Sequence, residues 1–329
     1  MTFCAGVRTD ESRLRLTDLP YEGSFMMRTS AHLVTGLMMA GLATPSAVNA
    51  TQQGSTFVGH TATVDGTRIY YRTGGTGPAL ILLHGYAQTS RMWNRIMPEL
   101  AKRFTLIVPD LPGIGDSDIP ANGMDMKTAA SRIHSLARSL GVTKASVVGH
   151  DIGLMVAYAY AAQFPSETTK LVEMDAFLPG VGNWRDIYDN PNLWHFRFHG
   201  RSPELLVKGR ERNYFDYYWD EFAADSTRSI SPADRNAYVA AYSRPGRMRA
   251  GWAYFASFPQ TAKDFALLAK TRLTMPILAI GGERGNGVAL GQQIKLVGTN
   301  VTVVVLRNTG HWLLDENPRE TTAALLRFL

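Results

Sequence analysis

The residues best suited to chemistry in this chain lie where an apolar run changes into a helix-forming run, in Gly149-His150-Asp151-Ile152-Gly153. This pentapeptide has the form of a nucleophile elbow, G-x-S-x-G, in which a sharp strand-to-helix turn exposes the middle side chain above a sheet. The middle residue here is Asp151 instead of serine. A carboxylate can attack a saturated carbon and form an alkyl ester. The motif therefore favours epoxide opening or halide displacement over cleavage of an ester or a peptide.

The elements that must position Asp151 follow from the alternation of apolar runs and helix-forming runs. This alternation is typical of an α/β fold, a mostly parallel sheet with helices on both faces. A hairpin of strands 61–64 and 67–71 is expected around Asp65-Gly66. Further strands are expected at 78–83, 104–109, 146–148, 170–174, 276–280 and 301–305. Because the strand at 146–148 leads directly into the elbow, Asp151 is expected above the sheet.

A helical cap is predicted between Pro179 and about Lys263, because strand-like runs stop there and Trp, Tyr, Phe and Arg become frequent. The predicted organisation is a leader at 1–50, core segments at 51–179 and 264–329, and the cap at 180–263. Some cap aromatics are expected to line an apolar pocket, and others to pack the cap onto the core. The candidates are Trp184, Trp194, Phe196, Phe198, Tyr214, Phe215, Tyr217, Tyr218 and Trp219.

The leader has the features of a secretory signal peptide at 26–50. Two methionines and an arginine precede an apolar stretch, and small residues follow as far as position 50, in the order of n-region, h-region and cleavage site. The mature protein is expected to begin near Thr51 and to be periplasmic or secreted, with translation starting at Met26 or Met27. Cleavage would remove Cys4, the single cysteine, which excludes a thiolate nucleophile and a disulfide in the mature chain.

Composition favours a soluble enzyme that acts on a small molecule. The 329 residues are 45% hydrophobic, which is enough to bury a large core. The formal charge of +6 is dispersed, without a block of Lys and Arg, so nucleic acid is not an expected partner. No apolar run of the body is long enough to span a membrane. The histidines lack metal-binding spacing, so neither a metal nor an organic cofactor is expected; a homodimer is left open.

Four motifs in order resemble the α/β-hydrolase fold, in particular its epoxide hydrolase and haloalkane dehalogenase branch. The likeness extends from about Gly59 to Leu329. The motifs are His84-Gly85-Tyr86, Asp110-Leu-Pro-Gly113-Ile-Gly115-Asp116-Ser117, the elbow at 149–153 and Gly310-His311-Trp312. The resemblance implies a core with an inserted cap, and it makes a mere helix-capping role for Asp151 the weaker interpretation.

The resemblance also implies a base and an acid that orients it. His311 follows the last predicted strand, where the fold places a catalytic histidine that activates water. The acid can come from either of two loops. Asp175 follows the strand at 170–174, and Glu283 follows the strand at 276–280. Because the aspartate usual in G-x-x-D is replaced by Gly285, Asp175 is favoured and Glu283 remains the alternative.

The same resemblance assigns the oxyanion hole to the backbone N–H groups of Tyr86 and Ile152, which follow the His-Gly turn and the nucleophile. Trp194-His195-Phe196 is similar to a W-H-F motif of secreted bacterial epoxide hydrolases, in which histidine replaces the first of two ring-opening tyrosines. This similarity implies that His195 donates a proton to the epoxide oxygen. The structural alternative is that His195 simply packs beside Trp194.

The second donor is the point where the chain departs from the family pattern. Relatives carry a helix resembling F-E-Y-Y-R, whereas the matching stretch here is Trp252-Ala-Tyr254-Phe255-Ala, and Phe255 has no hydroxyl. Tyr254 is rotated by about 100 degrees from that position on a helix. Three alternatives follow: the helix is rotated so that Tyr254 donates, Tyr242 donates instead, or the leaving group needs no second donor. The last alternative favours a halide.

Epoxide hydrolysis through an ester on Asp151 is the function predicted first, with a small hydrophobic epoxide and water as substrates. Dehalogenation by the same aspartate is the second prediction. Haloalkane dehalogenases usually carry tryptophan after the nucleophile, and haloacetate dehalogenases carry arginines in H-D-R-G-x-R, whereas this chain has Ile152 and Met155. A non-catalytic ligand-binding protein on a hydrolase core is the third alternative.

Overall fold

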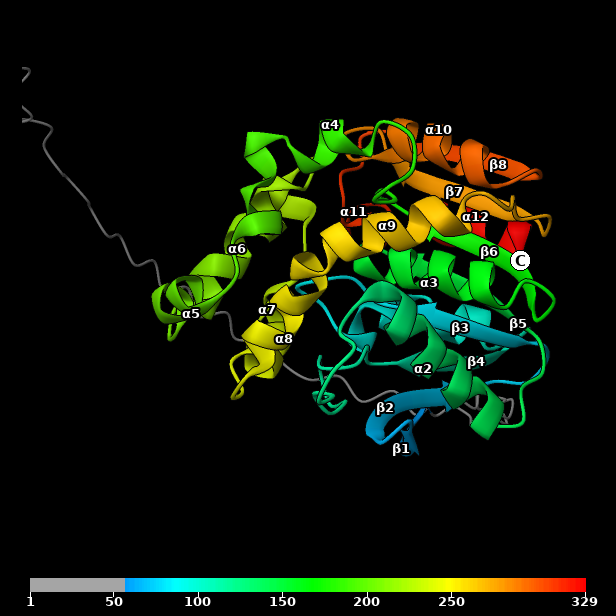
Figure 1. Ribbon diagram of the computed structural model, residues 1–329, viewed down its shortest axis with the longest axis horizontal. Coiled ribbons are helices and arrows are strands. Elements are labelled where there is room, and N and C mark those ends of the chain that lie inside the picture. Colours follow the sequence, from blue (N-terminus) through cyan, green and yellow to red (C-terminus); the bar gives the residue numbers. More distant parts are fainter. Residues whose placement is uncertain (1–56) are drawn as a thin grey trace, which may run out of the picture. The chain divides into compact units, whose positions relative to one another are not determined.

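Residues 57–329 are the part of the chain that the computed structural model describes, and their strands form one eight-stranded sheet (Figure 1). The strand order is β1-β2-β4-β3-β5-β6-β7-β8. The β1 strand (Val58–Val64) pairs with β2 (Thr67–Gly74), and β2 pairs with β4, in antiparallel fashion; the other pairs are parallel. The predicted signal peptide and Cys4 lie outside the described residues.

The parallel strands agree with the sequence prediction to within one or two residues. They are β3 (Ala79–Leu83), β4 (Thr105–Pro109), β5 (Ala145–His150), β6 (Thr168–Met174), β7 (Ile277–Gly282) and β8 (Val301–Leu306). The predicted hairpin is also confirmed, because Val64 pairs with Thr67 across Asp65-Gly66. All six residues of β5 are buried, as expected for a parallel strand that is covered on both faces.

Two separate apolar cores cover the two faces of the sheet. Successive residues of a strand point to opposite faces, so Ile81 packs in one core and its neighbour Leu82 in the other. The helices α2 (Met126–Ser139), α3 (Ile152–Gln163), α9 (Phe258–Leu268) and α10 (Gly287–Val297) pack in the first core. The second core contains η1 (Ser90–Arg95), α1 (Met97–Leu100), α11 (Leu313–Glu316) and α12 (Pro318–Phe328).

The segment between β6 and β7 is helical, as the sequence predicts for a cap, and most of its helices lie beyond one end of the sheet (Figure 1). Its helices before α9 are α4 (Trp184–Tyr188), η2 (Pro191–Arg197), α5 (Arg201–Val207), α6 (Glu211–Glu221), η3 (Ser226–Arg228), α7 (Pro232–Tyr242) and α8 (Arg247–Ala256). Cap and core belong to one compact unit. Among the described residues, none of the helices has both the length and the apolar character that a bilayer span requires.

Candidate active site

Asp151 lies at the junction of β5 and α3, in a backbone conformation that presents its side chain above the sheet. Its φ is 55° and its ψ is −123°, which is a strained region for a residue with a side chain. The N–H of Asp151 is bonded to the carbonyl of Met174, at the end of the neighbouring strand β6. Sheet pairing therefore continues up to the nucleophile and holds the strained turn in place.

The two glycines of the elbow are required by lack of space. Neither has a positive φ, and the sharp turn is made at Asp151 itself. A Cβ on Gly149 would lie 2.1 Å from the carbonyl oxygen of Gly153, and one on Gly153 would lie 2.5 Å from that of His84. The helix α3 can pack tightly behind the nucleophile only because both side chains are absent.

His311 lies beside Asp151, in the loop between β8 and α11. Its Nδ1 is 2.9 Å from Oδ2 of Asp175, and its Nε2 is 3.8 Å from Oδ2 of Asp151. Burial lowers the pKa of His311, but the hydrogen bond to Asp175 and the charges of Asp175, Asp151 and Glu316 outweigh burial and raise it. The imidazole can therefore take a proton from a water molecule near Asp151.

The loop after β7 makes room for Asp175, which follows β6. Oδ1 of Asp175 accepts hydrogen bonds from the N–H groups of Gly282 and Asn286, each at 2.9 Å. A Cβ on Gly285 would lie 2.5 Å from Oδ2 of Asp175. The carboxylate of Asp175 thus occupies the space beside the position where relatives with G-x-x-D carry their acid.

Glu283, the alternative acid, is exposed and accepts a hydrogen bond from the N–H of Asn308 at 3.0 Å. It supports the loop after β8 and does not contact His311. Of the two acids considered from the sequence, the structure brings Asp175 to the histidine.

The two backbone N–H groups that the sequence analysis assigns to an oxyanion hole both donate to Asp151. The N–H of Tyr86 donates to Oδ1 at 2.7 Å, and the N–H of Ile152 also donates to this carboxylate. Burial raises the pKa of Asp151, while His311 and these two donors oppose the rise. The two carboxylate oxygens therefore have different surroundings, since Oδ1 accepts the N–H of Tyr86 and Oδ2 faces His311.

A cavity of about 210 Å³ opens beside Asp151 and His311. Its apolar wall consists of Met155, Ala176, Phe177, Ile187, Leu193, Phe196, Phe222 and Phe258. Of the nine cap aromatics proposed from the sequence, only Phe196 lines this cavity; several of the others pack against one another, as Phe215 does against Trp219 at 5.5 Å between ring centroids. Asn190, Glu221, Arg284 and Asn286 supply polar groups.

His195 lines the same cavity from η2, as the sequence predicts for a donor above the nucleophile. Burial, together with the charge of His311, lowers the pKa of His195 to about 3. The imidazole is therefore neutral at physiological pH and can donate an N–H hydrogen bond. Its Nδ1 is buried without a hydrogen-bond partner among the described residues.

Neither tyrosine proposed from the sequence faces the cavity as expected. The hydroxyl of Tyr254 donates to the carbonyl of Pro112 at 2.9 Å, and that of Tyr242 donates to the carbonyl of Gln88 at 3.3 Å. Phe255 is the residue of α8 that packs against His195, with 5.4 Å between ring centroids. The helix α8 is thus not rotated to bring Tyr254 beside His195.

Tyr218, which the sequence analysis counts among the cap aromatics but not among the candidate donors, lies next to His195. Tyr218 of α6 packs edge-on against His195, with 5.1 Å between ring centroids and an interplanar angle of 80°. Its hydroxyl is buried and lies near the hydroxyl of Tyr214. Tyr218 is not among the residues that line the cavity, but it is the tyrosine that contacts the ring of His195.

The comparisons with known proteins agree with this geometry. The family model described as alpha/beta hydrolase fold matches residues 78–318. The chain belongs to the α/β-hydrolase fold family. The soluble epoxide hydrolase of Corynebacterium sp. strain C12 is 31% identical over 277 residues, which cover 82% of this chain and 96% of that protein.

Two further comparisons place this α/β hydrolase among enzymes with related chemistry. The structure titled epoxide hydrolase CorEH without ligand has 28% identity and a TM-score of 0.77, covering 83% of this chain and 98% of that one. The fluoroacetate dehalogenase of a Burkholderia species is 37% identical over 165 residues, 46% of this chain and 54% of that protein. The protein is an enzyme of the hydrolase class, with epoxide hydrolases and a dehalogenase among its relatives.

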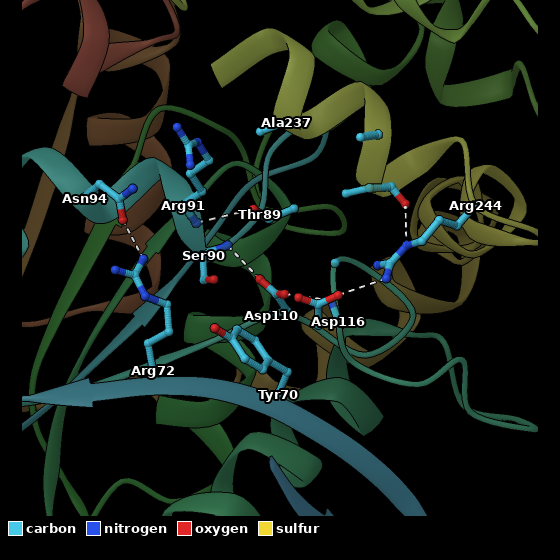
Figure 2. A pocket seen from close by; sticks show the side chains of 13 residues that line it. Tyr70, Arg72, Thr89, Ser90, Arg91, Asn94, Asp110, Asp116, Ala237 and Arg244 are labelled. Atoms are coloured by element: carbon cyan, nitrogen blue, oxygen red, sulfur yellow. Dashed lines mark hydrogen bonds and ion pairs between the residues drawn. The ribbon is translucent and has the colours of Figure 1, made fainter. Parts of the chain in front are cut away.

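A larger cavity of about 550 Å³ lies elsewhere in this hydrolase, where α7 meets β2 and η1 (Figure 2). Its side chains pair with one another, as Arg244 does with Asp116 at 2.8 Å. Asp110 accepts hydrogen bonds from the N–H groups of Ser90 and Asp116. None of the residues placed around Asp151 lines this cavity, so it is separate from the candidate active site. Across residues 57–329, no cluster of His, Cys, Asp and Glu could hold a metal ion.

Proposed function

We propose that this hydrolase opens an epoxide to a vicinal diol through a covalent ester on Asp151. The observation that carries the proposal is the opposed placement of the two oxygens of Asp151. Oδ2 faces His311 at 3.8 Å, and Oδ1 accepts the N–H of Tyr86 at 2.7 Å. A nucleophile whose ester must later be hydrolysed needs both surroundings.

In the first step, Oδ2 of Asp151 attacks a ring carbon from the cavity, and the bond between that carbon and the epoxide oxygen breaks. The departing oxygen needs a hydrogen-bond donor as its negative charge develops. His195 lines the cavity as a neutral N–H donor, and we assign the second donor to Tyr218, beside His195. The oxygen takes the proton of the Tyr218 hydroxyl, which becomes a phenolate, and it becomes the first hydroxyl of the diol, while His195 donates a hydrogen bond.

In the second step, His311 removes a proton from water, and the resulting hydroxide attacks the ester carbonyl carbon. Negative charge develops on Oδ1, which the N–H of Tyr86 already holds, and the N–H of Ile152 donates to the same carboxylate. Collapse breaks the bond between the carbonyl carbon and Oδ2, and the imidazolium of His311 gives its proton to Oδ2 as the diol leaves with that oxygen. The carboxyl group left on Asp151 loses its proton, which restores the Tyr218 hydroxyl, so the Asp151 carboxylate is regenerated. Asp175 keeps His311 oriented and stabilises the imidazolium.

Dehalogenation is the second candidate. The absence of a hydroxyl at Phe255 favours it, because a halide leaves without a proton. Ile152 is fully buried, however, and the cavity residue Met155 is apolar, so these two positions provide neither the tryptophan nor the arginine that dehalogenases carry there. A binding protein without activity is the third candidate. The hydrogen bond between His311 and Asp175 argues against it, because it orients a base that a binding protein would not need.

The test is to trap the ester in the variant His311→Gln. Incubation with a panel of alkyl and aryl epoxides is expected to leave an adduct on the Asp151 peptide that mass spectrometry detects. The control variant His199→Gln, changed at an exposed histidine, should hydrolyse the epoxide without accumulating an adduct. Asp151→Asn should form no adduct. Lack of any adduct with the whole panel, together with halide release from bromoacetate or bromoalkanes by the unmodified enzyme, would replace this proposal with dehalogenation.

A further inference from the structure

The carboxylate of Glu316 is buried beneath the loop that carries His311 and has its acceptor positions filled by backbone donors. Oε2 accepts the N–H of Gly310 at 3.0 Å and the N–H of Ala224 at 2.7 Å, and Oε1 accepts the N–H of Trp312 at 3.0 Å. Gly310 and Trp312 flank His311, whereas Ala224 belongs to the cap. One side chain therefore links the two neighbours of the candidate base to the cap.

The backbone of His311 itself is held from two other directions. Its N–H donates to the carbonyl of Phe222, at the end of α6, at 2.8 Å. Its carbonyl accepts from Nε2 of His150, the residue before the nucleophile, at 2.9 Å. A Cβ on Gly310 would lie 2.4 Å from the carbonyl oxygen of Phe222. Cap and loop are thus in close contact at the base.

We propose that Glu316 is a positioning residue that sets the place of His311 relative to Asp151 and couples that place to the cap segment after α6. The role rests on the proposed function in one respect, since ester hydrolysis is the step that uses His311. The residue does not contact the reacting atoms; it acts through the loop.

A carboxylate is required here because all three of the donors are N–H groups. A glutamine of the same shape has one acceptor oxygen and one NH₂ group. If its oxygen serves Gly310 and Ala224, its NH₂ faces the N–H of Trp312, and two donors meet without an acceptor. A buried donor that has lost its partner is destabilising, so the loop is expected to move away from its place over Asp151.

The charge of Glu316 also acts on the pKa of His311, an effect that a displaced loop with the charge retained would not produce. The ionisable groups around His311 are Asp151 and His150 at the elbow, Asp175 after β6, Glu316 of α11 and His195 of the cap. Glu316 is one of three carboxylates that raise the pKa of His311. Removal of its charge is therefore expected to lower the pKa of His311. The rate of ester hydrolysis, which increases with pH as His311 loses its proton, should then increase at a lower pH.

The experiment compares Glu316→Gln with Glu320→Gln, an exposed glutamate of α12, in single turnovers with an epoxide. Glu316→Gln should form the Asp151 ester at the normal rate but hydrolyse it about 10- to 100-fold more slowly, as a misplacement of about 1 Å allows. The pH at which hydrolysis reaches half its maximum should fall. Glu320→Gln should match the unmodified enzyme in both steps.

If the glutamine variant does not fold, Glu316→Asp tests the same positioning role. It keeps the charge on a shorter side chain, so hydrolysis should slow while the pH dependence stays in place. Unchanged hydrolysis in both variants, or an equal loss of ester formation and ester hydrolysis, would overturn the proposal. NMR titration of the His311 imidazole needs no substrate: a lowered pKa in Glu316→Gln supports the role of Glu316 even if no epoxide reacts, which would refute only the proposed function.

Discussion

Glu173 provides a test of the buried electrostatics that is independent of any substrate. It lies in β6 with no exposed surface, between Gly149 of β5 and Ala279 of β7. Neither carboxyl oxygen has a hydrogen-bond partner among the described residues, and the nearby hydroxyl of Tyr158 has none either. Burial raises the pKa of Glu173 well above its usual value, so the folded protein keeps this carboxyl protonated where the unfolded chain has lost the proton.

The sign of the effect on stability follows from proton counting. Above the unfolded pKa of about 4.3, the folded state binds one proton more than the unfolded state, so stability decreases as pH rises. Each pH unit costs about 1.4 kcal/mol while the folded carboxyl stays protonated. Glu173→Gln removes this dependence. Its free energy of unfolding, relative to the unmodified protein, should therefore rise by about 1.4 kcal/mol for each pH unit above pH 5 over which the folded carboxyl stays protonated.

The assay is equilibrium urea unfolding of both proteins at several values between pH 5 and pH 8, followed by circular dichroism. The informative quantity is how the difference in unfolding free energy between the two proteins changes with pH. Its value at a single pH also contains the cost of burying the glutamine amide, about 1–3 kcal/mol. Glu99→Gln, at an exposed position, should give a flat difference. A flat difference for Glu173→Gln as well would mean that the folded carboxyl is ionised, and the argument from burial would be refuted.

Three further predictions concern the site and the leader. Tyr218→Phe should slow ester formation from an epoxide by about 100-fold, the low end of a general-acid effect, and should leave ester hydrolysis unchanged. The control variant Tyr217→Phe should form the ester at the normal rate. Normal ester formation in Tyr218→Phe would exclude this donor. Gly285→Ala should slow ester hydrolysis, because its Cβ would lie 2.5 Å from Oδ2 of Asp175; an unchanged rate would show that the carboxylate has room to move. Export with removal of the leader should give a mature N-terminus near Thr51, and recovery of peptides from residues 1–25 in the exported protein would contradict it.

The strands and the position of the nucleophile could be predicted from sequence because both depend on local order. Apolar runs that are buried on both faces identify parallel strands, and Asp151 follows one of them directly. The preference for Asp175 over Glu283 could also be predicted from sequence, because Gly285 stands where relatives carry an acid. The space beside this glycine is filled by the carboxylate that follows the neighbouring strand β6.

The second donor could not be predicted, because its place depends on how cap helices pack. The sequence places Tyr254 and Phe255 100 degrees apart on a helix, but it does not say which of them faces His195. The structure turns Phe255 to His195 and Tyr254 to Pro112. Tyr218 comes from a different helix, and its proximity to His195 is a tertiary contact without a local sequence signal.

The cap takes part in both proposed half-reactions, which follows from where α6 ends. Tyr218, in the last turn of this helix, packs against His195, so a movement of α6 would displace the donor for ring opening. Phe222, one residue beyond the helix, accepts the N–H of His311, so the same movement would displace the base for ester hydrolysis. A substitution that loosens α6 without touching the cavity should therefore slow both steps, whereas Glu316→Gln, which acts beyond the end of α6 and leaves Tyr218 packed against His195, should slow only the second.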